Sequence, residues 1–194
     1  FYIQSDMNGE TNMKKSIKRK TDRYVQFRNS TNSINYRDKK AIIDQFNKSV
    51  REYKRFSEVY SGGDEELASS KLRDAGTDLY MCCEWAIKNC LYRKYDEQLA
   101  AHKISPNYRE YKVNQLSTKS ATIKYLLNEL EDICISSTDI IDIDFQKIIR
   151  NAQEVNNNPK HNRTIPDPSL YKTTLEEVRK IIKYFVDENA EMEF

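Results

Sequence analysis

The stretch that decides the fold covers residues 38–60 and reads DKKAIIDQFNKSVREYKRFSEVY. Its apolar side chains recur at steps of three, four and seven positions, at Ile43, Phe46, Val50, Tyr53 and Tyr60. This period places them on one face of an α-helix, and Phe56 and Val59 broaden that face. We therefore predict an amphipathic helix that ends at Ser61-Gly62-Gly63, because consecutive glycines interrupt helical structure.

A second and longer helix is predicted from Asp64 to about Gln98. Asp64 suits the N-cap position, because its carboxylate accepts hydrogen bonds from the free backbone N–H groups of a first helical turn. The apolar positions at helical spacing are Leu72, Ala75, Leu79, Cys82, Ala86 and Cys90. Gly76, in the middle of this pattern, indicates either a bend or the close crossing of another helix.

Three further amphipathic helices are predicted downstream. The third helix is predicted to begin at Ser117 or Thr118 and to end at Ser136-Ser137. The fourth is predicted to begin at Asp142 or Asp144, and the last at Thr173. Thr173 and Glu176 have the spacing of a capping box. The apolar positions that support these helices are Ile123, Leu127, Leu130, Cys134, Phe145, Ile148, Ile149, Ala152, Leu175, Val178, Ile182 and Phe185.

Two connecting stretches show no helical pattern. Residues 108–116 have no clear period, and residues 156–168 are rich in asparagine and proline, which favour turns and oppose helix. Five amphipathic helices bury their apolar faces most simply in an all-α, antiparallel helical bundle. The predicted organisation is a flexible basic leader at residues 1–37 and a bundle domain at residues 38–190.

Composition excludes several other classes. Only four glycines and four prolines occur in 194 residues, which argues against the many tight turns of an all-β fold. No run of about 18 apolar residues is present, so no membrane span is expected. The cysteines, Cys82, Cys83, Cys90 and Cys134, lack paired zinc-ligand spacing. We expect buried reduced thiols in a cytoplasmic protein, with no metal site and no cofactor.

Charge is distributed unevenly along the chain. A basic stretch, interleaved with Tyr24 and Phe27, contains Lys14, Lys15, Lys18, Arg19, Lys20, Arg23 and Arg28. It is suited to RNA phosphates and bases, or it is a disordered charged leader. A later acidic stretch that includes Glu129, Glu131 and Asp132 is interpreted as a solvated face.

The residues suited to chemistry lie between Arg150 and His161. Arg150 supplies a permanent planar cation that matches a phosphate, and His161 exchanges protons near neutral pH. Together they are the minimal parts for cleaving RNA without a metal ion. Two simpler interpretations stay open. His161 could be a histidine at the surface without a catalytic role, and Arg150 has the spacing to pair with Glu154 one turn later.

An all-helical bundle with Arg150-Asn151 near the end of its penultimate helix, then His161, then a final amphipathic helix, resembles the HEPN superfamily. The resemblance covers residues 38–187, and it implies a metal-independent endoribonuclease that works as a homodimer in toxin or antiviral defence systems. Arg150 and His161 would then be catalytic, with Asn151 as a supporting polar residue. Lys160 and Arg163 would add positive potential that attracts RNA.

Ten residues separate Arg150 from His161, more than the family usually has. The site is therefore a variant of the family pattern, or His161 is unrelated to it, or the domain keeps the fold without the activity. The alternative function is a non-catalytic helical dimerisation or interaction module of a longer protein. A third is a nucleic-acid binder that uses the basic stretch at residues 14–28.

Overall fold

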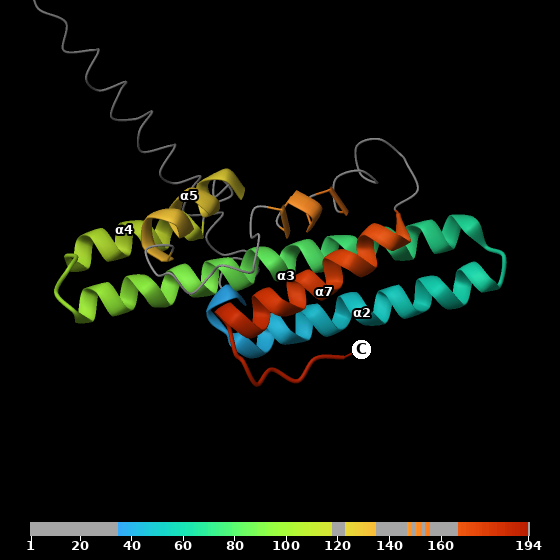
Figure 1. Cartoon of the computed structure of the whole chain (residues 1–194), viewed down its shortest axis with the longest axis horizontal. Coiled ribbons are helices and arrows are strands. Elements are labelled where there is room, and N and C mark those ends of the chain that lie inside the picture. The colour runs from blue at the N-terminus through green and yellow to red at the C-terminus, as the bar shows by residue number, and fades with distance from the viewer. Residues whose placement is uncertain are drawn as a thin grey trace, which may run out of the picture. The chain divides into compact units, whose positions relative to one another are not determined.

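The computed structural model describes residues 35–117, 123–134, 147–148, 150–152, 154–155 and 167–193. All of them belong to the unit that spans residues 34–194. They form a short 3-10 helix and five bounded α-helices: η2 (Asn35–Arg37), α2 (Lys39–Ser61), α3 (Glu65–Ala100), α4 (Pro106–Leu116), α5 (Ile123–Cys134) and α7 (Pro168–Phe185) (Figure 1). Residues 147–148, 150–152 and 154–155 are also helical. No strand occurs in these ranges, and the prediction of an all-α helical bundle is confirmed.

The α2–α3 hairpin begins and turns where the sequence predicts. The Asp38 carboxylate caps α2 by accepting from the Lys40 N–H at 2.9 Å, and the Asp64 carboxylate caps α3 by accepting from the Leu67 N–H at 3.0 Å. Gly63 between them has a φ of 85°, a left-handed conformation that costs glycine little. The predicted end of the first helix and the predicted Asp64 cap are both confirmed.

Contacts along the hairpin show that α2 and α3 run antiparallel. The Ser49 hydroxyl donates to the Ala75 carbonyl at 2.7 Å, and the Cys82 thiol donates to the Ile42 carbonyl at 3.4 Å. Thus the later of these two α3 residues, Cys82, contacts the earlier of the two α2 residues, Ile42. Asn89 continues this order at the far end, where its amide donates to the Tyr36 carbonyl of η2 at 2.8 Å.

Helix α7 lies against both arms of the hairpin and completes a three-helix core. The Tyr171 hydroxyl donates to the Ser49 carbonyl at 3.0 Å, and the Tyr171 ring stacks on Tyr53 with centroids 4.5 Å apart. At the other end of α7, the Arg93 guanidinium donates to the Phe185 carbonyl. Helix α7 therefore runs antiparallel to α2 and in the same direction as α3.

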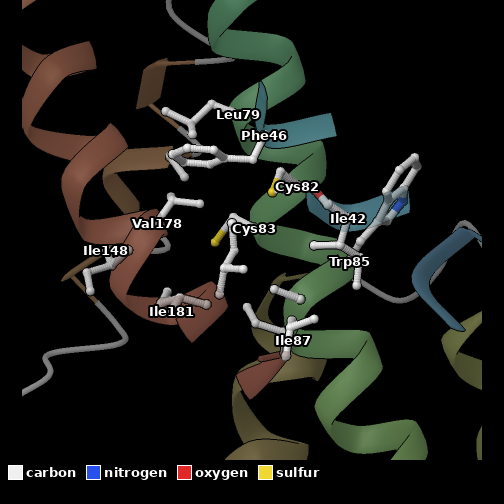
Figure 2. Close-up of a cluster of buried hydrophobic side chains, with 14 of the residues drawn as sticks. Ile42, Phe46, Leu79, Cys82, Cys83, Trp85, Ile87, Ile148, Val178 and Ile181 are labelled. Carbon is white, nitrogen blue, oxygen red and sulfur yellow. Dashed lines mark hydrogen bonds between the residues drawn. The ribbon is translucent and has the colours of Figure 1, made fainter. Parts of the chain in front are cut away.

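The interior of this core is apolar (Figure 2). Its fully buried side chains include Ile42, Phe46, Leu79, Val178 and Ile181. The predicted apolar face of α2 is confirmed except at its end, where Tyr60 is 61% exposed. Tyr53 already packs near the start of α7, so α7 does not extend over the last turn of α2.

Helix α4 was not predicted from the sequence, because only two of its side chains, Val113 and Leu116, are buried. Two buried positions in 11 residues are too few to show a period. The start signals were nevertheless present. The Ser105 hydroxyl accepts from the Tyr108 N–H at 3.2 Å, and Pro106 occupies the first turn, where a missing N–H costs nothing.

The predicted start of the last helix at Thr173 is wrong. Helix α7 begins five residues earlier at Pro168, and Asp167 is its cap, with its carboxylate accepting from the Ser169 N–H at 2.8 Å. Thr173 is an interior residue whose hydroxyl donates to the Ser169 carbonyl at 3.1 Å. A proline in the first turn starts a helix rather than stopping one, and this explains the error.

Other predicted boundaries lie outside the described residues. They include Thr118 as a start of the third helix, its end at Ser136-Ser137, the start of the fourth helix and the turn-rich residues 156–166. The other predicted start of the third helix, Ser117, is wrong, because Ser117 is the C-cap of α4. Residues 1–34 of the predicted leader also lie outside, whereas residues 35–37 form η2 with Tyr36 buried. None of the described helices combines the length and apolarity needed to span a bilayer.

Gly76 marks a close crossing rather than a bend. A Cβ atom on Gly76 would lie 2.6 Å from Val155 Cγ1 and 2.9 Å from the Val155 carbonyl oxygen. Both distances are below van der Waals contact, so only glycine lets the helical residues near Val155 approach α3 this closely. Of the two alternatives that the sequence left open, the structure selects the crossing.

We expect Gly76→Ala to destabilise the fold by about 1–3 kcal/mol, because the added methyl group overpacks a tight contact. Alanine is more favourable than glycine inside a helix by up to about 1 kcal/mol, so Gly76→Ala would stabilise the fold if there were room for the methyl group. Urea unfolding measures it, and adding Val155→Ala should recover only part of the loss, since the carbonyl clash persists. A Gly76→Ala chain as stable as the original would contradict the crossing.

Three thiols, Cys82, Cys83 and Cys90, are buried and take part in no disulfide, as predicted. Burial raises the pKa of Cys83 to about 12 from a reference value of 9.0, with a smaller contribution from the nearby Glu84 charge. The unfolded chain therefore loses this proton at a lower pH than the folded chain does. The corresponding stability is present below about pH 9 and is lost as pH rises towards 12.

We expect the free energy of unfolding to fall between pH 8 and pH 10, with the Cys83 thiol contributing about 1 kcal/mol of the fall. Urea unfolding at both pH values compares the original chain with Cys83→Ala. The variant should show a smaller decrease, whatever its stability at pH 8. Equal decreases in the two chains would show that this thiol ionises as easily in the folded state as in the unfolded state.

Candidate functional site

The predicted catalytic residues Arg150 and Asn151 lie on the helical residues between 147 and 155, which have a buried and an exposed face. The buried face consists of Ile148, Ala152 and Val155, which are 4%, 0% and 4% exposed. The exposed face consists of Lys147, Arg150 and Glu154. Both faces follow helical spacing.

This segment is held by two helices of the core. Val155 packs against Gly76 of α3, as described above. Ile148 belongs to the same buried apolar cluster as Val178 and Ile181 of α7 (Figure 2). Val155 packs at Gly76, level with the start of α7 at Tyr171, whereas Asn151 donates to Glu177 later in α7, so the segment and α7 run antiparallel. The backbone that carries Arg150 is therefore fixed on both sides.

Asn151 has a defined partner that the sequence did not single out. Its side-chain amide donates to Glu177 Oε2 at 3.1 Å, and both side chains are partly buried. The amide nitrogen is thus engaged with α7 rather than with a substrate. Glu177 carries no sequence signal, because the contact joins residues 26 positions apart across two helices.

Arg150 is exposed to solvent, one residue before the Asn151 contact. A guanidinium at this position is a permanent cation that can reach an anionic group in solution. Glu154 is also exposed and lies one turn later, so the predicted pairing of these two residues is compatible with the helix. That pairing stays a prediction.

The remaining predicted site residues lie outside the part of the chain that the structure describes. They are His161, Lys160, Arg163, Lys14, Lys15, Lys18, Arg19 and Lys20. The described segment ends at Val155, six residues before His161. The structure thus joins Asn151 to Glu177 and places Arg150 on the exposed face, and the convergence of Arg150 with His161 stays a prediction.

A second polar cluster lies where α3, α4 and α5 meet. The Tyr95 hydroxyl donates to Glu129 Oε2, and the Lys112 ammonium donates to Glu129 Oε1 at 2.6 Å. Glu129 is only 8% exposed, so its interpretation as part of a solvated acidic face is wrong. A buried carboxylate requires hydrogen-bond donors, and Tyr95 of α3 and Lys112 of α4 provide them.

The protonation of this cluster argues against acid–base catalysis there. Burial, together with the hydrogen bond to Glu129, raises the pKa of Tyr95 far above its ordinary value. Burial opposes the charge of Lys112, but the hydrogen bond and the charge of Glu129 outweigh it and raise the pKa of Lys112. Both groups keep their protons at neutral pH and are poor bases. The cluster therefore joins α5 to the core.

Within the described ranges, no three histidine, cysteine, aspartate or glutamate side chains are grouped as metal ligands would be. Comparisons with protein-family models, with curated proteins and with solved structures find no match for this chain. The resemblance to the HEPN superfamily consequently rests on the sequence pattern of Arg150, Asn151 and His161 and on the helical architecture.

We expect Lys112→Ala to destabilise the fold by about 3 kcal/mol, because it leaves the buried Glu129 carboxylate without its counter-ion. Lys94→Ala is the matched control, since Lys94 forms an exposed pair with Glu97 at 2.8 Å that is worth less than about 1 kcal/mol. Urea unfolding at pH 7 measures both changes. Equal small losses for the two variants would show that Glu129 does not depend on Lys112.

Proposed function

We propose that this chain is a metal-independent endoribonuclease of the HEPN-like type, which acts as a cytoplasmic homodimer in a toxin or antiviral defence system. The observation that carries the proposal is the exposure of Arg150 on a helical segment whose backbone is held by α3 and α7. The same segment leads within six residues to His161.

The proposed reaction needs a proton acceptor, a proton donor and a cation. The 2′-hydroxyl of RNA loses its proton and attacks the adjacent phosphorus, while the bond from phosphorus to the 5′-oxygen breaks and that oxygen is protonated. The products are a 2′,3′-cyclic phosphate and a 5′-hydroxyl. His161 exchanges these protons, and Arg150 offsets the negative charge that grows on the phosphate. A homodimer supplies two copies of each residue.

The rigidity of the segment supports this role for Arg150. Buried apolar contacts at Ile148, Ala152 and Val155 hold one side, and the Asn151–Glu177 hydrogen bond holds the edge towards α7. Only the arginine side chain then needs ordering when RNA binds, which lowers the entropic cost of positioning a cation at the phosphate. Asn151 acts in this proposal by fixing the segment and is a positioning residue.

Cleavage of single-stranded RNA in the presence of EDTA tests the proposal. We expect Arg150→Ala and His161→Ala each to lower the cleavage rate by about 100-fold or more, the usual contribution of a charge-stabilising or proton-transferring group. Arg55→Ala is the matched control, since Arg55 is an exposed arginine on α2, and it should retain the rate. Circular dichroism verifies that the variants remain folded.

Undiminished cleavage by either His161→Ala or Arg150→Ala would remove that residue from the catalytic role. A purified chain that forms a stable dimer but cleaves no RNA would contradict the nuclease proposal. It would instead favour the non-catalytic helical interaction module.

A further inference from the structure

The segment that follows α7 turns back over the core. Residues 187–193, which we call the tail, run antiparallel to α7 and in the same direction as α2 (Figure 1). Where the tail begins, the Asp187 carboxylate lies 4.0 Å from the Lys39 ammonium at the start of α2. At its other end, Glu193 contacts Arg51, further along α2.

The side chains of the tail alternate between the core and the solvent. Ala190 and Met192 pack against the buried apolar cluster, and Met192 is only 9% exposed. Asn189 and Glu191 are exposed. A period of two is the pattern of an extended chain, in which successive side chains point to opposite sides. This part of the tail is therefore extended and has two apolar anchors.

Side chains of α2 and α7 bind the backbone of Glu193. Asn47 Oδ1 accepts from the Glu193 N–H at 2.9 Å, and Arg179 Nη2 donates to the Glu193 carbonyl at 2.7 Å. Together they satisfy both backbone polar groups of one residue of an extended chain. Arg51 Nη1 adds an ion pair with the Glu193 carboxylate at 2.5 Å.

Arg179 is oriented by contacts within the core. Its Nη1 donates to both carboxylate oxygens of Glu176, at 2.9 and 3.0 Å, and its guanidinium lies 5.4 Å from the centre of the Phe46 ring. A donor that is already in place loses little entropy when a chain docks. Since Glu176 offsets the charge of Arg179, the preference for an acidic residue at the position of Glu193 comes from Arg51.

The tail is attached by contacts that open easily. Its ion pairs, Lys39–Asp187 and Arg51–Glu193, join exposed side chains, and such pairs contribute little to stability. A segment with few buried contacts can open while the rest of the fold stays intact. A short connection keeps the tail at an effective concentration that is only on the order of millimolar, so another segment that makes the same contacts and further ones displaces it.

We propose that this surface, formed by Asn47, Arg51, Arg179 and the part of the core that Met192 covers, binds an extended segment of a partner protein. We call it the tail-docking surface. The partner segment carries a long apolar residue followed directly by an acidic residue, as Met192 and Glu193 do. A second copy of this chain offers only the same contacts, so at micromolar concentrations its tail does not displace a tail that is already attached.

The tail occupies the tail-docking surface until the partner displaces it. This inference goes beyond the proposed function and does not depend on it, because none of these residues belongs to the segment that carries Arg150.

The probe is an acetylated and amidated peptide with the sequence of residues 187–193, DENAEME. The target is the full chain with Met192→Ala and Glu193→Ala, which weakens the resident tail and keeps the tail-docking surface. NMR follows the backbone amide signals of α2 and α7 up to about 10 mM peptide, above the effective concentration of an attached tail. We expect saturable shifts, and circular dichroism verifies that the target is folded.

Variants of the peptide test which side chains are recognised. Alanine in place of Met192 should remove the saturable shifts, because the buried anchor is lost. Alanine in place of Glu193 should weaken binding about two- to fivefold, the range expected for an exposed ion pair. Alanine in place of Glu191 is the matched control and should leave binding unchanged, since Glu191 is exposed.

Variants of the target test the same ion pair from the other side. Arg51→Ala in the target should weaken binding of the original peptide about two- to fivefold. Arg55→Ala is the matched control, because Arg55 is an exposed arginine of the same helix that pairs with Glu52. It should bind the peptide with unchanged affinity.

The original chain provides a second measurement, which needs no substitution. The Glu193 N–H donates to Asn47 while the tail is docked, so displacement of the tail exposes this amide. Adding the original peptide should therefore speed the hydrogen exchange of the Glu193 amide severalfold. The peptide with alanine in place of Met192 should leave the exchange unchanged.

The outcomes decide the proposal in either direction. Saturable binding with these selective losses would support it. Absence of saturable shifts up to about 10 mM, with unchanged exchange of the Glu193 amide, would overturn it. Equal losses for Arg51→Ala and Arg55→Ala would overturn it as well. If the original chain is a dimer at micromolar concentration and the Met192→Ala, Glu193→Ala chain is a monomer, the surface binds a second copy and the partner proposal is overturned.

Discussion

The contact between Gly76 of α3 and Val155 is the constraint on which the candidate site depends. Without a side chain on Gly76, the helical segment approaches α3 closely enough to bury Ile148, Ala152 and Val155. That burial turns Lys147 and Arg150 outward and brings Asn151 within hydrogen-bonding distance of Glu177. One missing Cβ atom on α3 thus determines where the helical segment places Arg150.

The two polar regions of the bundle differ in whether their charged groups are buried or lie at the surface. Between α3, α4 and α5, the Glu129 carboxylate is buried with Tyr95 and Lys112, and these groups satisfy one another. Beside α7, Glu177 accepts from Asn151 and Glu176 is paired with Arg179, and Arg150 lies on the exposed face of the neighbouring helical segment. Charges satisfied inside a fold contribute to its specificity, whereas charges at the surface contribute to the electrostatic potential that an approaching ligand meets.

The sequence predicts the helical class, the α2–α3 hairpin and the Asp64 cap, because these depend on local periodicity and capping chemistry. It does not predict α4, whose buried positions are too few, or the burial of Glu129, whose partners come from other helices. Arg150 and Asn151 were found through a family pattern. Glu177, the partner of Asn151, could be found only from the register between the helical segment and α7, which no local spacing encodes.

The central claim is that Arg150 and His161 meet at one RNA phosphate. A crystal structure of the homodimer with a 2′-O-methyl oligoribonucleotide tests it most directly, through the distances from the Arg150 guanidinium and the His161 imidazole to that phosphate. The account predicts that both groups contact the same phosphate, within one protomer or across the twofold axis. Arg150 and His161 on separate faces of the dimer, with no phosphate between them, would contradict it.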